Sequence, residues 1–464
     1  MADTTLIIDD ERSLKRTVLF VMSAASFIIS FSGSACNLAL PTIGREFNAS
    51  AIALGWVISG FVLSSSIFLL PFGRLGDIIG MKKIFSLGML LFAASTFFIS
   101  LSWNIVVLIS FRLLQGISAA MLFSTSIAII TTAFPPGERG RALGINVTLI
   151  YLGFSMGPVL GGLLTQYFGW RSIFGVLVPF QAALFILSKL KIKREWADAA
   201  SEKFDLKGSI VYGIGLLSFM YGFSSLPALK GWICLSAGLV LLVLFGFIEL
   251  RTASPVFEVR LILTNRIFTF SSAAALINYA ATNAIGFFIS LYLQYPKGFD
   301  ARTAGLIMIS RPLAQTLFSP VAGRLSDKVN PGKLASVGMG IISIGLILFC
   351  FINENTHIAY LVALLLLVGV GFGLFSSPNQ YAIMSSVEKK YLGIASGVLG
   401  TARHIGQMTS MSIAMLLLSL YIGKETITPA VYPGLITTIR TGFLIFAILS
   451  GLGILASLAR NKRN

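Results

Sequence analysis

Long apolar segments separated by short polar ones run through the whole chain. A helix needs about 20 apolar residues to cross a bilayer core about 30 Å thick. Fourteen segments approach or exceed that length and are predicted as membrane helices: Thr17–Pro41, Ala51–Leu70, Ile84–Ser102, Ile105–Ala133, Ala142–Gln166, Ile173–Leu190, Gly208–Leu226, Gly231–Leu250, Ile267–Tyr295, Thr303–Ala322, Leu334–Ile352, Ile358–Ser385, Leu392–Ile422 and Thr441–Ala459. Membrane strands would show about 10 residues of alternating polarity, so the pattern predicts an all-α membrane protein.

The composition supports this class. Of the 464 residues, 56% are hydrophobic and 11% are charged, whereas soluble domains have about 25% charged residues. A soluble enzyme, a disordered chain and a nucleic-acid binder are therefore excluded. The three cysteines lie far apart in apolar runs and the two histidines are isolated, so neither a disulfide framework nor a metal site is expected.

The basic residues predict the orientation. If both termini are cytoplasmic, 25 of the 35 Lys and Arg residues fall on the cytoplasmic side and 7 on the outer side. Such a bias follows the positive-inside rule, and it explains the net charge of +17 without a nucleic-acid partner. The expected location is the plasma or inner membrane. The remaining three basic residues, Arg112, Arg311 and Arg403, lie inside predicted helices.

An internal repeat divides the chain. The sequence GRLGD at Gly73 recurs as GRLSD at Gly323, and LGI at Leu143 recurs at Leu392. Two parallel six-helix copies around a cavity are a known transporter architecture. The expected segments are a cytoplasmic N-terminus 1–16, a first bundle 17–190, a linker 191–207, an inserted two-helix hairpin 208–250, a linker 251–266, a second bundle 267–459 and a cytoplasmic tail 460–464.

The repeated loop carries turn glycines and an acidic residue between basic ones. This segment resembles the signature loop of the major facilitator superfamily, and the resemblance extends over essentially the whole chain. It implies the major facilitator fold and a gating role for both loops, in which the matching residues are Gly73, Arg74, Asp77, Gly80 and Lys82 in the first copy and Gly323, Arg324 and Asp327 in the second.

Further motifs favour export within that family. Arg112 and Gln115 lie in a segment similar to the second family motif. The antiporter motif is matched by Gly153, Gly157, Pro158, Gly161 and Gly162, where a bent, tightly packed helix is expected. A helix that is merely kinked for packing is the alternative. The chain resembles the drug:proton antiporter-2 branch in two features, which are the number of fourteen predicted helices and the sequence Asn37–Pro41 in the first of them.

The charges inside the predicted helices depart from that branch. No Asp or Glu lies in the middle of any predicted helix, and Ser32 stands where the branch commonly has an aspartate. A cation:proton antiporter needs a buried carboxylate. Arg112, Arg311 and Arg403 suggest instead a cavity of positive potential, or they satisfy backbone carbonyls. His404 is a candidate for the coupling proton, or a packed polar residue.

Three functions stay open. The leading hypothesis is a monomeric secondary exporter of hydrophobic or amphipathic small molecules, working by alternating access and antiport, with no cofactor beyond a proton gradient. The second is an anion or organic-acid transporter, and the third a lipid translocase or a membrane sensor. No enzyme is expected, and the lipid bilayer and a small molecule are the expected partners. The uncharged pathway candidates are Asn37, Gln115, Asn278, Asn379 and Gln407.

Overall fold

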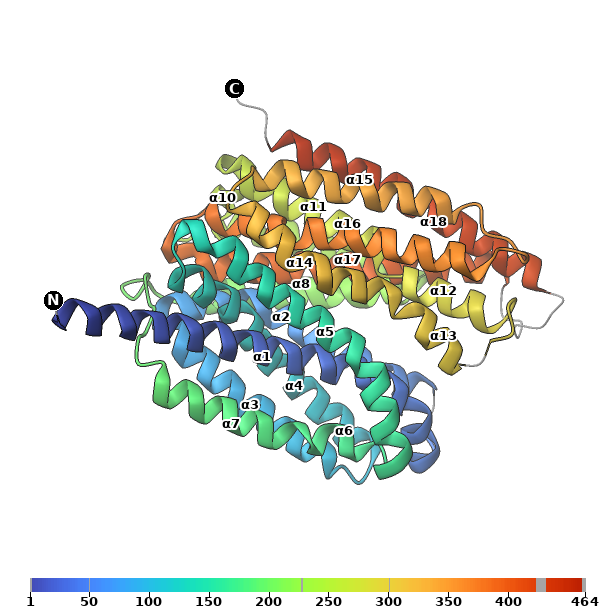
Figure 1. Cartoon of the computed structure of the whole chain (residues 1–464), viewed down its shortest axis with the longest axis horizontal. Helices are drawn as coiled ribbons and strands as arrows, with labels where there is room; N and C mark the ends of the chain where they lie inside the picture. The colour runs from blue at the N-terminus through green and yellow to red at the C-terminus, as the bar shows by residue number, and fades with distance from the viewer. Residues whose placement is uncertain (1, 50, 227, 300, 423–430, 461–464) are drawn as a thin grey trace. The chain divides into compact units, whose positions relative to one another are not determined.

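Helices make up all the regular structure that the computed structural model describes, in residues 2–49, 51–226, 228–299, 301–422 and 431–460 (Figure 1). The chain divides by packing into two units. Unit 1 consists of Met1–Ser209, Arg251–Glu258 and Val387–Gly400, and unit 2 of Ile210–Leu250, Val259–Ser386 and Thr401–Asn464. The division differs from the repeat in that most of the expected hairpin lies in unit 2 and residues 387–400 lie in unit 1.

Unit 1 is built around α4, which packs against α1, α2 and α3, while α5 packs along α1 and α7 along α3 (Figure 1). Its helices are α1 (Ala2–Phe47), α2 (Ala51–Ile79), α3 (Met81–Ser100), α4 (Ile105–Ala133), α5 (Pro136–Phe168), α6 (Arg171–Gly175), α7 (Leu177–Lys191), η1 (Lys389–Tyr391) and the first residues of α8 (Leu206–Ser224) and α17 (Leu392–Tyr421). Most of α4 beyond its first two turns is buried, as expected of a central helix.

Two helices hold unit 2 together. The first is α16 (Ile358–Ser385), which packs against α11 (Arg266–Thr282), α14 (Ser310–Ser326) and α15 (Pro331–Phe349). The second is α18 (Tyr432–Ala459), which packs against α11 and α15. Hydroxyl pairs join α15 to α18, since the Oγ atoms lie 2.7 Å apart between Ser336 and Ser457 and 2.8 Å apart between Ser343 and Ser450. Small polar residues of this kind join membrane helices closely. The other helices of unit 2 are α9 (Leu229–Glu249), α10 (Val259–Thr264), α12 (Ile285–Gln294) and α13 (Ala301–Met308), together with the rest of α8 and of α17.

Each of the fourteen predicted segments lies on a helix or on two consecutive helices. Among the described residues, ten segments are long and apolar enough to cross a membrane, and α5 makes an eleventh if its two parts, bent by 40°, form one span. A total of fourteen spans and the inserted hairpin α8–α9 therefore stay predictions.

Three predicted segments are broken in the structure. The segment Ile267–Tyr295 divides into α11 and α12 at Asn283 and Ala284. The Ala284 N–H donates to Ser410 Oγ at 2.9 Å, and Asn283 Nδ2 donates to the Gln407 carbonyl at 3.4 Å. A side chain from α17 thus satisfies a backbone group that the break releases, as an apolar environment requires.

Large apolar side chains cover the outside of the helices. The exposed fractions are 60% for Phe20 on α1, 65% for Val240 on α9 and 64% for Leu455 on α18. A surface of this kind would drive association in water, and it matches a surrounding of lipid chains. Together with the long apolar helices, it indicates a multi-pass membrane protein.

A polar cluster joins the end of α1 to the start of α6. Glu46 forms an ion pair with Arg171 at 2.6 Å and accepts a hydrogen bond from Trp170 Nε1 at 2.7 Å. Burial alone would raise the pKa of Glu46. The hydrogen bonds from Trp170 and Arg171, together with the charge of Arg171, lower it overall. The carboxylate form is therefore favoured in the folded state.

Candidate functional site

The signature loop is a tight turn between α2 and α3. Gly80 has φ of +120°, a conformation that other residues rarely adopt, and a Cβ atom there would lie 2.6 Å from the carboxyl carbon of Glu195. The Lys82 N–H donates to Glu195 Oε1 at 2.8 Å. Glycine at this position therefore lets a carboxylate cap the first turn of α3.

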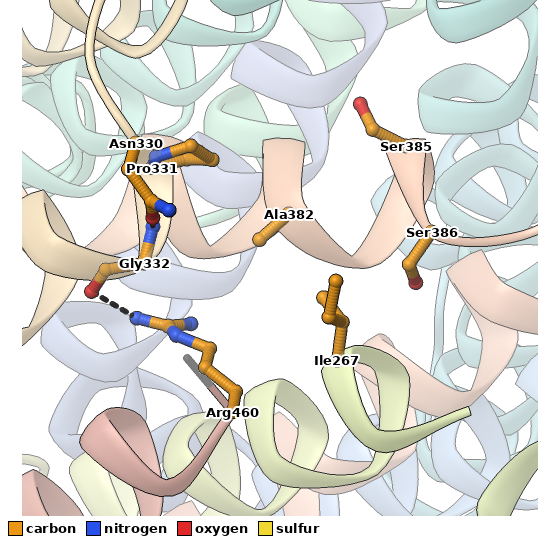
Figure 2. A pocket seen from close by; sticks show the side chains of 8 residues that line it. All are labelled: Ile267, Asn330, Pro331, Gly332, Ala382, Ser385, Ser386 and Arg460. Atoms are coloured by element: carbon orange, nitrogen blue, oxygen red, sulfur yellow. Dashed lines mark hydrogen bonds between the residues drawn. The ribbon is translucent and has the colours of Figure 1, made fainter. Parts of the chain in front are cut away.

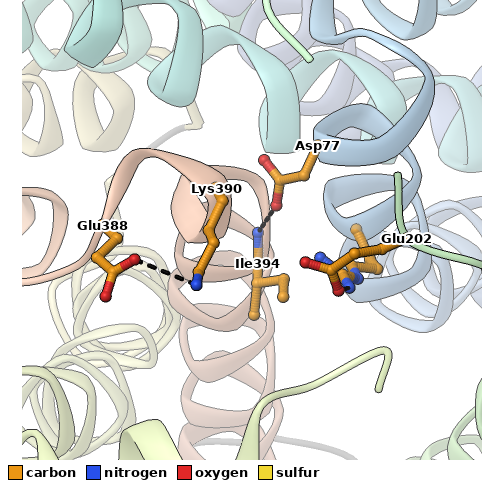
Figure 3. A network of polar contacts seen from close by, with 6 residues as sticks. Asp77, Glu202, Glu388, Lys390 and Ile394 are labelled. Carbon is orange, nitrogen blue, oxygen red and sulfur yellow. Dashed lines mark hydrogen bonds and ion pairs between the residues drawn. The ribbon is translucent and has the colours of Figure 1, made fainter. Parts of the chain in front are cut away.

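Asp77 lies in the last turns of α2, fully buried, and binds the beginning of α17 (Figure 3). Its Oδ1 accepts from the Gly393 N–H at 2.8 Å, and its Oδ2 accepts from the Ile394 N–H at 3.1 Å. A carboxylate is favoured at a helix N-terminus because the backbone N–H groups there are unpaired and the helix dipole is positive. This contact joins residues 316 or more positions apart within unit 1.

Two glycines allow this contact. A Cβ atom at Gly73 would overlap the carbonyl oxygen of Gly393, and one at Gly393 would overlap that of Gly73. Any side chain at either position would push α2 and α17 apart, and Asp77 would then lose its partners. The signature glycine is therefore needed for close approach of two helices.

Arg74 is held by the segment that follows α7. Its exposed fraction is 1%, and it forms an ion pair with Glu202. Two backbone bonds add to this connection, from the Ala199 N–H to the Asp77 carbonyl at 3.0 Å and from the Met81 N–H to the Trp196 carbonyl at 2.8 Å. The sequence predicts residues 191–207 only as a linker, although this segment contains Glu195 and Glu202.

The second copy of the loop has different surroundings. Arg324 is exposed and Asp327 is half-buried at the end of α14, whereas Arg74 and Asp77 are buried. Gly323 is buried. The two copies of the repeat are therefore similar in sequence and unequal in structure.

The glycines of the antiporter motif pack α5 closely against α1. A Cβ atom would lie 2.5 Å from the Phe27 carbonyl oxygen at Gly153, 2.6 Å from Ser34 Cβ at Gly157 and 2.7 Å from Ala35 Cβ at Gly161. The helix also bends by 40° between Gly157 and Val159, on either side of Pro158, while Gly162 is half-buried. Close packing and a bend are both present, as the motif predicts.

Arg112 and Gln115 form a buried polar network in α4. Arg112 donates through Nε to the Val57 carbonyl at 2.9 Å and through Nη1 to Gln115 Oε1 at 2.6 Å, and its guanidinium lies 4.5 Å from the Phe61 ring centroid. Gln115 Nε2 donates to Thr96 Oγ1 at 2.8 Å and lies 3.5 Å from Ser32 Oγ. These hydrogen-bond partners of the arginine are neutral.

Two arginines of unit 2 lie over an aromatic pair. The Arg403 guanidinium is 6.0 Å from the Tyr279 ring centroid, and that of Arg311 is 5.6 Å from the Phe372 centroid. The two rings meet edge to face at 5.5 Å. We call these four residues the arginine–aromatic cluster. His404, beside Arg403, is buried with an exposed fraction of 7%.

The uncharged candidates separate into different surroundings. Asn37 is exposed on α1, and Gln407 is half-buried on α17. Asn278 is fully buried, and neither polar atom of its side chain has a hydrogen-bond partner in the described ranges. Asn379 donates to the Ser271 carbonyl at 3.0 Å and accepts from Arg460 Nη1 at 2.8 Å. The sequence predicts Arg460 as part of the cytoplasmic tail 460–464, whereas in the structure its side chain is buried.

The charged groups of the candidate site have both neutral and charged partners. Arg112 contacts backbone, amide and aromatic groups, whereas Arg74 forms an ion pair with Glu202. Within the part of the chain that the structure describes, no three His, Cys, Asp or Glu residues are placed to hold a metal ion together.

Comparisons with known proteins identify the family of the chain. The family model described as the Major Facilitator Superfamily matches residues 22–275 and 271–464. The riboflavin transporter RibZ of Clostridioides difficile is 29% identical over 84% of this chain and 85% of its own length. The multidrug resistance protein Stp of Mycobacterium tuberculosis is 27% identical over 86% of this chain and 76% of its own.

A third relative and two solved structures complete the comparison. The tetracenomycin C resistance and export protein of Streptomyces glaucescens is 24% identical over 87% of this chain and 76% of its own. The human organic anion transporter MFSD10 has a TM-score of 0.69 at 14% identity, covering 96% of this chain and 99% of that one. The proton:xylose symporter XylE has the same score at 13% identity, covering 96% and 95%.

Proposed function

The chain belongs to the major facilitator superfamily, a family of membrane transporters and not enzymes, and from that premise we propose that it exports hydrophobic or amphipathic small molecules. Relatives named for multidrug resistance and for tetracenomycin C export support this direction. We further propose fourteen spans, both termini in the cytoplasm and a monomeric unit. The observation that supports the substrate class is the presence of three arginines inside the helices, of which Arg112 is buried and Arg311 and Arg403 are half-buried.

The charge of those arginines favours neutral, zwitterionic or anionic solutes. Arg112 donates to neutral groups, and Ser32 contributes a hydroxyl where a cation exporter would have a carboxylate. A cationic solute would meet an unfavourable field in this surrounding, because charge–charge interactions are strong where water is excluded. The arginine–aromatic cluster offers cations above ring faces together with ring edges, which suits a planar aromatic solute.

Alternating access requires that the contact between Asp77 and α17 break during each cycle. In our proposal this contact holds one end of the pathway closed, and the Arg74–Glu202 ion pair holds the loop in place. The close packing of α5 on α1 limits leak of ions when no solute is bound. Coupling to protons is assigned to His404, since the middle of the predicted helices has no Asp or Glu.

Flux in proteoliposomes tests the exporter and its coupling together. Purified protein is reconstituted, riboflavin is used as the aromatic probe, and flux is measured with and without an imposed pH gradient. We expect the gradient to accelerate flux and His404→Ala to abolish that acceleration. His357→Asn is the matched control, because His357 is an exposed helix cap and asparagine also caps helices. If flux is the same with and without the gradient, and the same in wild type and His404→Ala, proton coupling through this residue is wrong.

A second candidate function is transport of organic anions, favoured by the three arginines at Arg112, Arg311 and Arg403. In that case Arg403→Gln should weaken an anionic substrate at least tenfold more than a neutral one of the same shape. Equal losses for the two substrates would exclude an anion site at Arg403.

A further inference from the structure

The internal repeat provides a comparison between the starts of α3 and α15. In unit 1 the Glu195 carboxylate accepts from the Lys82 N–H at the start of α3. In unit 2 the equivalent first turn of α15 is capped by a neutral amide, because Asn330 Oδ1 accepts from the N–H groups of Gly332 at 2.8 Å and Lys333 at 3.2 Å. A carboxylate therefore adjoins α3, whereas an uncharged side chain caps α15.

A buried arginine lies beside the start of α15. Arg460 has an exposed fraction of 4%, and Figure 2 shows its side chain directed toward Gly332. It donates through Nη1 to Ser271 Oγ at 3.0 Å and Asn379 Oδ1 at 2.8 Å, and through Nη2 to the Gly332 carbonyl and Ser457 Oγ, both at 2.6 Å.

These four partners of Arg460 are neutral, and its Nε atom is buried without a partner among the described residues. Burial lowers the pKa of Arg460 to about 10, so the guanidinium is still protonated at neutral pH. A buried cation that lacks a counter-charge is energetically unfavourable. An anion that entered this region would recover part of that free energy.

A cavity of about 150 Å³ adjoins the guanidinium (Figure 2). A cavity of that volume holds several water molecules and so has room for a tetrahedral anion. The described residues that line the cavity are Ile267, Asn330, Pro331, Gly332, Ala382, Ser385, Ser386 and Arg460. None of these residues is acidic. Two further cations flank the lining in sequence, since Arg266 precedes Ile267 and Lys333 follows Gly332.

We propose that this cavity, the Arg460 pocket, binds a phosphate-class anion, supplied either by an anionic phospholipid headgroup or as free phosphate. The pocket lies where α15 begins and α18 ends, and therefore at the polar edge of apolar helices, where headgroups are found. Ile267, which is 45% exposed, gives the pocket an apolar side that a lipid chain can contact. The site is separate from the arginine–aromatic cluster and does not depend on the transported solute.

Binding of defined lipids and ions to the full-length protein tests the proposal. Native mass spectrometry would measure retention of phosphatidylglycerol against phosphatidylcholine. A melting assay in phosphatidylcholine nanodiscs would compare inorganic phosphate with chloride at equal ionic strength. Retained phosphatidylglycerol identifies a headgroup as the ligand, and stabilisation by phosphate alone identifies the free ion.

Two variants and a control show whether the anion binds in the Arg460 pocket. Arg460→Gln removes the charge, and Ala382→Met fills the cavity while it keeps the arginine. Each should weaken anion binding about tenfold, equivalent to about 1.4 kcal/mol. Arg440→Gln on the same helix, where Arg440 is exposed and bonds the Ile352 carbonyl, should bind as wild type. Equal binding by wild type, Arg460→Gln and Ala382→Met, or no preference of wild type for either anion, would overturn the proposal.

Discussion

Replacing Asp77 by asparagine should loosen the contact between α2 and α17. The carboxylate accepts two backbone N–H groups, from Gly393 and Ile394. Hydrogen bonds to a charged group contribute about 1.5–3 kcal/mol each, and asparagine keeps one neutral acceptor but turns an amide N–H₂ group toward the second donor. The net loss should be about 2–3 kcal/mol, which shifts the equilibrium between contact and separation by about 30- to 150-fold.

Labelling of a buried cysteine measures that shift. Ser396 is a suitable position, because it lies on α17 with an exposed fraction of 1% and donates to the Phe123 carbonyl. In a background without the three native cysteines, Ser396→Cys should react with a maleimide at least tenfold faster when Asp77→Asn is present. Transport turnover should fall more than substrate affinity.

An exposed acidic residue near the same contact serves as the control. Glu388 forms a solvent-exposed pair with Lys390 at 3.2 Å (Figure 3), and such pairs contribute about 0–1 kcal/mol. Glu388→Gln should therefore label as the parent does. If Asp77→Asn labels within twofold of the parent, or if it lowers only substrate affinity, Asp77 does not hold this contact closed.

Three further predictions concern the same unit. Gly73→Ala should accelerate labelling of Ser396→Cys as Asp77→Asn does, whereas Gly137→Ala, which meets open space, should not. Glu202→Gln should lower the melting temperature, through a loss of about 2 kcal/mol, because Arg74 would stay buried without its charged partner. Glu46→Gln should melt earlier than wild type at pH 7. That difference should shrink and vanish as the pH falls through the lowered pKa of Glu46, because a carboxylate with a lowered pKa stabilises only while ionised. A difference that stays constant over the whole acidic range would contradict the ion pair as its source.

The helices were predictable from the sequence where local signals sufficed. The predicted bounds Ile105–Ala133 agree with α4, whose preceding residue Asn104 caps the helix by accepting from the Val107 N–H. The break between α11 and α12 was not predictable, because the segment contains no proline and is long enough to form one helix. It depends on Ser410, which lies 126 residues further along the chain.

The candidate site was predicted in its residues and not in its connections. The repeat identified Asp77 and also the LGI sequence at Gly393, but nothing local to either position shows that they meet. Arg460 was missed because an arginine just after an apolar segment is typical of positive-inside loops. Its burial depends on Ser271, Gly332 and Asn379, which are distant in sequence.

The charge preference of transport shows directly whether the arginines inside the helices determine the substrate class. Three probes with one aromatic ring system, carrying a carboxylate, an amide or an amine, would be compared for flux in proteoliposomes of wild type and Arg403→Gln. The arginines inside the helices predict that the carboxylate and amide probes are transported well and the amine probe poorly. They also predict that Arg403→Gln reduces flux of the carboxylate probe most. Fastest transport of the amine, unchanged by Arg403→Gln, would contradict the account.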